Sequence, residues 1–201
     1  ITGDAYIDSP FMGIAVVGRI LEDMGLRVGI IGQPDVNSDV DINRMGEPKL
    51  FWGVSGGSID SMVSNYTATK RYRSTDDYTP GGKNDKRPDR ATLVYTNLIR
   101  RYFKNTVPIV LGGIEASLRR LTHYDYWSDK LRKPILFDTK ADYMVYGMGE
   151  QAIMDLGNYL KDGKDPRTIK GLCYISKEPV VEYIQIPSHK ECLDEKEKYI
   201  D

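Results

Sequence analysis

The sequence predicts an α/β fold: a mostly parallel, doubly wound sheet of the flavodoxin-like or cobalamin-binding-like type, with one long inserted loop. Short β-branched runs recur along the 201 residues, and each ends at Gly or Ser. Between them lie helical patterns, the alternation that covers both faces of a parallel sheet. The composition, with 40% apolar and 28% charged residues, supplies a core and excludes disordered and coiled-coil proteins.

The predicted strands follow from these runs. Five of them should be parallel, in the spatial order 2-1-3-4-5 with right-handed crossovers. They are the leading run up to Gly3 and the runs at 27–32, 50–55, 107–112 and 141–146. Two further strands are expected at 170–175 and 180–186, joined by a turn at Glu178-Pro179.

Helices are expected between the strands, and four of them have a start signal for an N-cap or a first turn in addition to the helix that opens at Gly112-Gly113. In chain order these signals are Asp8 or Ser9 with Pro10, Ser58, Asp89, and Glu150. Gly25 should end the first helix and Gly163 the last, since glycine is favoured just beyond a helix.

Two stretches lack the alternating strand and helix patterns. Residues 66–90 show no periodicity and carry seven cationic against four acidic residues, with three interleaved tyrosines. This mixture could stack bases and contact phosphates, although a solvated loop that packs its tyrosines on the domain is the favoured interpretation. Residues 123–129 hold three aromatic residues and are expected to form an irregular covering loop.

The carboxyl ends of the predicted strands are the expected ligand crevice, because open α/β sheets bind ligands there. Three successive glycine-rich turns follow these ends and open helices, where backbone N–H groups could meet a ligand. The expected crevice residues are Asp4, Ser55, Gly56, Gly112, Gly113, Glu115, Gly147 and Glu150. None is assigned a catalytic role, since the helix dipole alone explains a carboxylate in a first turn.

Several other kinds of site are excluded by spacing. The glycine motifs of nucleotide-binding loops are absent, and Cys173 and Cys192 form neither a disulfide framework nor a zinc motif. His123 with Asp125 and Asp129 is better explained as a packed histidine than as a metal site. No apolar run reaches the roughly 20 residues of a membrane helix, and the net charge is −1. We therefore expect a cytoplasmic chain with no metal site and no membrane partner.

Six segments, taken together, resemble one family. They are Thr2–Asp8, Arg27–Asp35, Lys86–Ala91, Leu111–Arg120, His123–Asp129 and Ala141–Glu150. In this order they are similar to the YgiQ-type family of uncharacterised radical SAM proteins, from Thr2 to about Tyr174. The resemblance implies an amino-terminal domain similar to the cobalamin-binding domains of other radical SAM enzymes.

The resemblance also implies a 4Fe–4S cluster and S-adenosylmethionine in a longer protein. Their C-x-x-x-C-x-x-C loop is absent here, so this chain should bring no cofactor of its own. Residues 1–187 would form the Rossmann-like domain. Residues 188–201 would form a charged arm or linker toward a downstream radical SAM domain, the expected partner.

This sequence departs from the cobalamin-binding domains at their motif D-x-H-x-x-G. The stretch Asp8–Gly13 offers no histidine, so cobalamin held through a protein imidazole is not expected. Cobalamin without a protein ligand, or no cobalamin, are the two alternatives that stay open.

Three hypotheses for function follow. The first is an accessory domain, non-catalytic alone, that forms a crevice near the radical site. The second is an RNA- or nucleotide-binding module that uses residues 66–90 with Arg119 and Arg120. The third is an interaction scaffold that retains only the geometry of a ligand site.

Overall fold

The computed structural model describes residues 1–178 and 184–200. The main sheet contains four strands in the order β1-β2-β5-β6. The bounds of these strands are β1 Trp52–Ser55, β2 Ile109–Gly112, β5 Tyr143–Val145 and β6 Leu172–Cys173. β1, β2 and β5 pair in parallel, and β6 joins β5 antiparallel at the edge.

The N-terminal segment extends the sheet beyond β1. Thr2 forms parallel bridges to Ser55 on one side and to Gly32 on the other. Gly3 N–H donates to the Ser55 carbonyl at 3.1 Å, and Gln33 N–H donates to the Thr2 carbonyl at 2.8 Å. The predicted order 2-1-3-4-5 is therefore confirmed, and β6 follows at the far edge.

The leading run and the run at 27–32 are each shorter than predicted. Within them only Thr2 and Gly32 are paired as bridges, outside the regular strands. The run at 27–32 lies at the sheet edge and contains Gly29 and Gly32, which have no side chains to stabilise an extended backbone. At the C-terminal side, the strand expected at 170–175 shrinks to β6.

Nine helices occur in the described part of the chain. They are α1 Gly13–Asp23, α2 Val40–Asn43, α3 Ser61–Asn65, α4 Ala91–Tyr102, α5 Gly113–Leu118, α6 Ile135–Thr139, α7 Glu150–Lys161, α8 His189–Asp194 and α9 Glu197–Ile200. Two 3-10 turns, η1 Pro80–Gly82 and η2 Pro166–Thr168, lie in the connections. Over residues 1–178 and 184–200, no helix combines the length and apolar character needed to span a bilayer.

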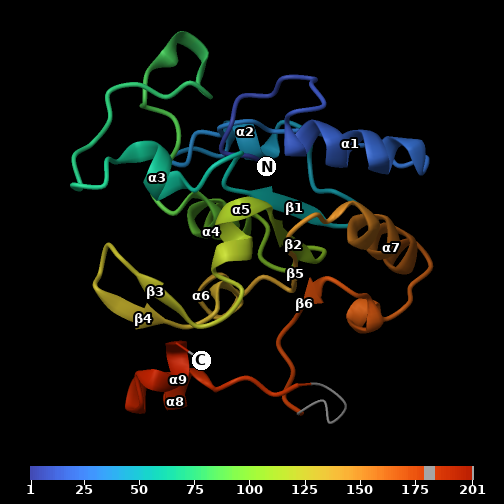
Figure 1. Cartoon of the computed structure of the whole chain (residues 1–201). Helices are drawn as coiled ribbons and strands as arrows, with labels where there is room; N and C mark the ends of the chain where they lie inside the picture. The colour runs from blue at the N-terminus through green and yellow to red at the C-terminus, as the bar shows by residue number, and fades with distance from the viewer. Residues whose placement is uncertain (179–183, 201) are drawn as a thin grey trace.

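Helices cover both faces of the sheet, as the doubly wound prediction requires. In β2, Ile109 and Leu111 join one core cluster, while Val110 points into the other. The first cluster includes Tyr95 and Leu98 of α4 and residues of α6. The second includes residues of α1 and α7, which contact each other along one side of the molecule (Figure 1). The strict alternation along β2 buries the strand on both sides.

Three of the predicted helix starts are wrong by one to three residues. α1 begins at Gly13 because Pro10 and Phe11 lie in a turn closed by Met12 N–H and the Ser9 carbonyl. α3 is capped by Asp60, whose carboxylate accepts from the backbone of Met62 and Val63, and not by Ser58. α4 follows Arg90, since the Asp89 carboxylate instead accepts from Asn65.

The remaining helix predictions are confirmed. α7 spans Glu150–Lys161 as expected, and Gly163 follows it with a φ of +68°. Gly25 likewise follows α1 with a φ of +77°. Both angles lie in the left-handed region that favours glycine after a helix.

The stretch expected to be irregular at 123–129 begins a β-hairpin. β3 (His123–Asp125) pairs antiparallel with β4 (Lys130–Arg132), with Tyr124 opposite Leu131. Asp129 takes a φ of +51° in the connecting turn. The long inserted loop at 66–90 is confirmed; it contains one 3-10 turn, η1, and isolated bridges.

Residues 184–200 carry the end of the described chain. The strand predicted at 180–186 falls partly outside the described residues, and 184–186 form no strand. Within the segment expected to be a charged arm or linker, 188–200 form α8 and α9, and α8 starts with a capping box between Ser188 and Glu191. The Tyr199 hydroxyl accepts from the backbone N–H of Tyr124 at 2.9 Å, so this segment lies against the β3–β4 hairpin.

Candidate functional site

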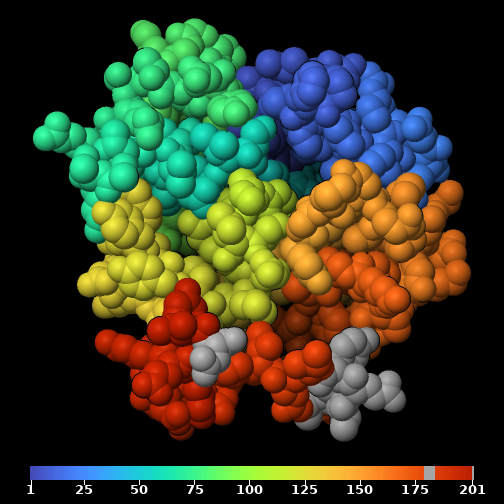
Figure 2. Space-filling model, in the orientation of Figure 1, coloured from blue at the N-terminus to red at the C-terminus, as the bar shows by residue number. Residues whose placement is uncertain are grey.

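The carboxyl edge of the parallel strands gathers most of the residues predicted to form a crevice. Asp4 follows the N-terminal run, Ser55 ends β1 and Gly56 follows it, and Gly113 and Glu115 open α5 after β2. Because parallel strands end at one edge, these residues meet although they are far apart in the chain. In Figure 2 the yellow-green α5 segment lies near the centre, between the teal, blue and orange segments of this edge.

Glu115 is the centre of this arrangement and is 1% exposed. One carboxylate oxygen accepts from Ser61 N–H, the first residue of α3, at 2.9 Å. The other accepts from Thr92 N–H in the first turn of α4, also at 2.9 Å. The carboxylate thus satisfies orphan donors at the start of two helices. The dipole of its own helix alone, the explanation offered by the sequence, does not account for this role.

Asp4 and Arg87 form a second buried group on the same edge. Arg87 Nη2 lies 2.9 Å from Asp4 Oδ1 and 3.2 Å from Asp76 Oδ2, and none of the three side chains is more than 2% exposed. Arg87 Nη1 also donates to the Gly56 carbonyl at 3.1 Å. Asp4 Oδ2 accepts from Ser58 N–H at 2.6 Å. The ionic group therefore fastens the long loop to the strand ends.

A third pair joins α3 to α5. Arg119 forms an ion pair with Asp60, and its Nη1 also donates to the Glu115 carbonyl at 3.0 Å. Asp60 is the N-cap of α3, so the pair links that cap to the last turn of α5.

Two glycines permit the close approach of these groups. A Cβ on Gly56 would lie 2.5 Å from a Glu115 carboxylate oxygen. Gly57 has a φ of +112°, and a Cβ there would lie 2.2 Å from Asp4 Oδ1 and 2.6 Å from Arg87 Nη1. The Gly-Gly sequence after β1 is therefore required by packing against carboxylates and a guanidinium.

The other predicted residues lie along the same edge. Gly113 takes a φ of +79° beside the Ser55 hydroxyl, and Gly112 is the N-cap of α5. Gly147 N–H donates to the Ser117 hydroxyl at 3.1 Å, which joins the end of β5 to α5. Glu150 begins α7, where the helix dipole favours a carboxylate, as the sequence indicated.

The backbone N–H groups at this edge are already occupied by carboxylates of the chain itself. The backbone donors of Ser58, Ser61 and Thr92 bind the chain's own carboxylates, so they do not meet an external anion. Burial raises the pKa of Asp76, but hydrogen bonds from Tyr78 and Thr79 and the Arg87 charge outweigh it and lower the pKa below its ordinary value. An ionised, sequestered network of this kind holds segments in place.

Sequence reasoning missed Asp60 and did not predict the buried ion pairs of Arg87, Asp76 and Arg119, the last of which it had assigned to nucleic-acid binding. Arginine and aspartate are mostly exposed, so a buried charged residue looks in sequence like a solvated one. The family resemblance could have pointed to some of these residues. The segments 2–8, 86–91 and 111–120, which resemble the family, contain Asp4, Arg87, Glu115 and Arg119.

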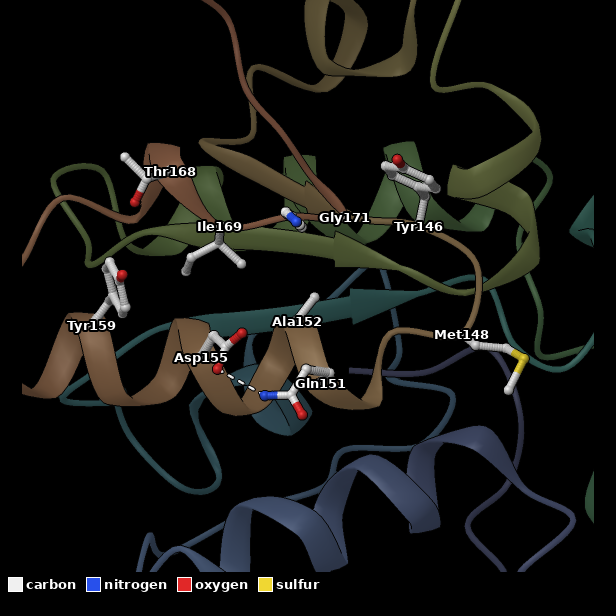
Figure 3. Close-up of a pocket in the computed structure, with 10 residues that line it drawn as sticks. Tyr146, Met148, Gln151, Ala152, Asp155, Tyr159, Thr168, Ile169 and Gly171 are labelled. Atoms are coloured by element: carbon white, nitrogen blue, oxygen red, sulfur yellow. Dashed lines mark hydrogen bonds between the residues drawn. The ribbon is translucent and has the colours of Figure 1, made fainter.

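Two shallow pockets lie outside this network. The first, of about 500 Å³, runs between α7 and the segment before β6, and Figure 3 shows Gln151 and Asp155 joined by a hydrogen bond beside it. Tyr146 and Met148 line its end at the carboxyl edge. The second, of about 690 Å³, lies near the start of β5 and η2. Neither is lined by the residues predicted to form the crevice.

The residues present do not fit a 4Fe–4S cluster. A radical SAM cluster needs three thiolates, and the chain has two cysteines. Cys173 is in β6 at the sheet edge, and Cys192 is buried in α8. In the described part of the chain, no group of three or more His, Cys, Asp and Glu side chains is placed to hold a metal ion.

The residues also do not fit cobalamin held through a histidine. Asp8, near the position where the motif would begin, pairs with Arg19 of α1. His123 lies in the β3–β4 hairpin with Nδ1 3.2 Å from the Leu121 carbonyl, and His189 contacts Thr122 on the same part of the molecule. Neither imidazole lies on the segment after the first strand.

Comparison with known proteins gives consistent results. The family model described as "Radical SAM N-terminal" matches residues 1–201. The UPF0313 protein FN0734 of Fusobacterium nucleatum is 59% identical over 202 residues, and a UPF0313 protein of Thermotoga maritima is 52% identical over 204. Each match covers 100% of this chain but 36% of the relative. The chain thus spans about a third of the length of these relatives.

Among solved structures, the chain is similar to the radical S-adenosylmethionine methyltransferase TsrM of Kitasatospora setae. One structure, with tryptophan and a SAM analogue bound, matches with a TM-score of 0.56 and 19% identity over 87% of this chain and 27% of TsrM. A second, with cobalamin and a 4Fe–4S cluster bound, has a TM-score of 0.55 and 19% identity over 88% and 28%. At this identity the likeness shows a shared fold.

Proposed function

The chain belongs to the radical SAM N-terminal family, and we propose that it acts as a non-catalytic covering domain of a longer radical SAM protein. In this proposal its carboxyl edge docks on the downstream part of the same protein, near the radical site. The partner in this proposal is the rest of the longer protein, which corresponds to the part of the relatives that this chain does not match. The chain spans 36% of the Fusobacterium nucleatum relative.

The observation that carries the proposal is a set of exposed apolar side chains on segments that follow strand ends. Phe11, before α1, and Met148, after β5, are each 92% exposed. Ile7, Ile114 and Leu118 are also exposed, and the last two belong to α5. Exposed apolar side chains gathered on one edge mark an interaction surface. We name these five residues the apolar rim.

A covering role agrees with the buried network beneath the rim. Glu115 fixes the starts of α3 and α4, and Arg87 fixes the long loop, so the edge is held in one conformation. A rigid surface loses little conformational freedom when it docks.

The chemistry itself would come from outside this chain. A 4Fe–4S cluster with S-adenosylmethionine supplies a radical in such proteins. A radical must be kept from water and side reactions, and a domain closing over the site excludes both. We place the surface facing that site at Ser55, Gly112, Gly113, Gly147 and Glu150. Figure 2 shows a recess between the blue N-terminal segment and the orange segments of the chain.

The test compares two substitutions in the full-length protein. Leu118→Asp places a charge in the apolar rim, and Phe137→Asp makes the same change on α6, outside the rim; these side chains are 59% and 50% exposed. The proposal predicts that Leu118→Asp releases the domain and raises the radius of gyration measured by small-angle X-ray scattering. Phe137→Asp should leave it unchanged. Equal radii for Leu118→Asp and the unaltered protein would contradict the proposal.

A further inference from the structure

Two aromatic segments that are far apart in the chain meet on one face of the molecule. Tyr66 and Tyr72 belong to the long loop, and Tyr126 and Trp127 to the β3–β4 turn. The ring centroids of Tyr66 and Trp127 are 4.8 Å apart, and those of Tyr66 and Tyr72 are 5.4 Å apart. Tyr126 lies edge-on to Trp127 at 5.8 Å. We call these four rings the aromatic face.

Hydrogen bonds of the hydroxyl groups fix these rings. Tyr66 donates to Asp89 at 2.7 Å, Tyr126 donates to the Ala68 carbonyl at 2.8 Å, and Tyr72 donates to the Asn84 carbonyl. Two of the rings nevertheless stay accessible, since Tyr72 is 55% and Tyr126 50% exposed, whereas Tyr66 and Trp127 are half-buried. Rings that are oriented before a ligand arrives lose little freedom on binding.

Three exposed cations surround the aromatic face. Lys70 Nζ lies 4.7 Å from the centroid of Tyr126 and 5.7 Å from that of Trp127. Arg73 Nε donates to the Tyr66 carbonyl at 3.0 Å, and Arg71 is exposed beside it in the chain. Across residues 1–178 and 184–200, none of these three cations forms an ion pair with a carboxylate.

Three acidic residues near this face are ion-paired or accept hydrogen bonds. Asp125 is buried and pairs with Arg90 at 2.8 Å. Asp89 accepts from Asn65 and Tyr66, and Asp129 accepts from the Tyr124 hydroxyl at 2.7 Å. The donors to Asp89 and Asp129 are neutral, so these two exposed carboxylates keep their charge. The face nevertheless presents three cations that form no ion pair in the described part of the chain, next to exposed aromatic rings.

We propose that this face binds single-stranded nucleic acid. Bases would stack on Tyr126, Trp127 and Tyr72, while Lys70, Arg71 and Arg73 contact the phosphates. Fixed aromatic rings beside free cations are the features that bind single strands without reading their sequence. An acidic peptide would use the cations but not the ring faces. The aromatic face is separate from the apolar rim, so this inference does not depend on the proposed docking.

The test measures binding of a fluorescent single-stranded oligonucleotide by anisotropy, with the full-length protein. Lys70→Ala, Arg71→Ala and Arg73→Ala are combined in one variant. The control variant combines Lys49→Ala, Lys104→Ala and Lys161→Ala, which remove three exposed cations from segments away from this face. Since each phosphate contact contributes about 0.7 to the slope of log affinity against log salt, the first variant should lower that slope by about 2. The control should not change it.

The ring contribution is tested separately. Tyr126→Ala should weaken binding by roughly 5- to 150-fold, the effect of losing one stacked base. Tyr126→Phe keeps the ring, loses only the hydroxyl, and should bind within a few-fold of the unaltered protein. Circular dichroism of both variants reports whether the fold is retained.

Three results would overturn the inference. They are no binding at low salt, equal weakening by the two triple variants, and equal binding by the Tyr126→Ala and unaltered proteins. Competition by an acidic peptide together with insensitivity to Tyr126→Ala would assign the face to a protein partner instead.

Discussion

The guanidinium of Arg87 lies 2.9 Å from a carboxylate oxygen of Asp4, and both side chains are buried. The pair joins the end of the long loop to the end of the first strand. It fixes the position of a segment that has little regular structure of its own.

Arg87→Met should strongly destabilise the chain. The change leaves the carboxylates of Asp4 and Asp76 buried without their partner, which typically costs about 3–5 kcal/mol. Arg167→Met is the matched control, because Arg167 pairs with Asp165 at an exposed site, where the loss of stability should be much smaller. Urea unfolding followed by tryptophan fluorescence measures both. Equal losses for the two variants would show that the buried pair is not a stabilising contact.

Glu115→Ala should cost about 2–6 kcal/mol, since two buried N–H donors each lose their acceptor at roughly 1–3 kcal/mol. These donors belong to Ser61 and Thr92. Glu115→Gln keeps one carbonyl oxygen and should lose about half as much. Ile114→Ala, at a neighbouring exposed position, serves as the control in the same urea titration. The account of Glu115 fails if its alanine variant is as stable as that of Ile114.

Gly57→Ala should destabilise the chain by about 2–4 kcal/mol. Its φ of +112° is strained for alanine, and the new Cβ would overlap Asp4 and Arg87. Gly53, in β1, has open space around the same position, so Gly53→Ala should leave stability unchanged or slightly raised. Thermal unfolding compares the pair. A tolerated alanine at position 57 would mean that the edge can rearrange.

The Asp125–Arg90 pair predicts a specific dependence of stability on pH. Burial raises the pKa of Asp125, but hydrogen bonds from Arg90 and Ser128 and the Arg90 charge outweigh it and lower the pKa from 3.8 to about 2. The pair thus stabilises the fold fully above about pH 4. Its contribution is lost as the pH falls from 3.8 through about 2.

Asp125→Asn isolates this contribution. Urea midpoints of the variant and the unaltered chain should differ most at pH 5 and converge as the pH falls toward 2. A difference that stays constant over this range would exclude ionisation of Asp125 as its cause.

The strand order could be predicted because β-branched runs ending in glycine mark strands and parallel crossovers permit few arrangements. Helix ends were less predictable, since several residues compete for each cap. Asp8 pairs with Arg19, and Asp60 rather than Ser58 caps α3. The β3–β4 hairpin was missed because its strands have three residues each, too few for a period-2 pattern.

The candidate site was predictable in its position but not in its contents. Strand-end reasoning located Asp4, Gly56 and Glu115 on one edge. It did not reveal that Arg87 and Asp76 come from the loop to fill that edge, because burial of a charge depends on a distant partner. The amides expected to meet a ligand therefore bind the chain's own carboxylates.

The most direct test of the central claim is photo-crosslinking of the full-length protein from position 118. A photoreactive phenylalanine analogue replaces Leu118 in the apolar rim, and a second protein carries it in place of Phe137. Mass spectrometry then identifies the crosslinked peptides. The account predicts that position 118 crosslinks to residues beyond 201 and that position 137 does not. Crosslinks to residues beyond 201 from position 137, with none from position 118, would contradict it.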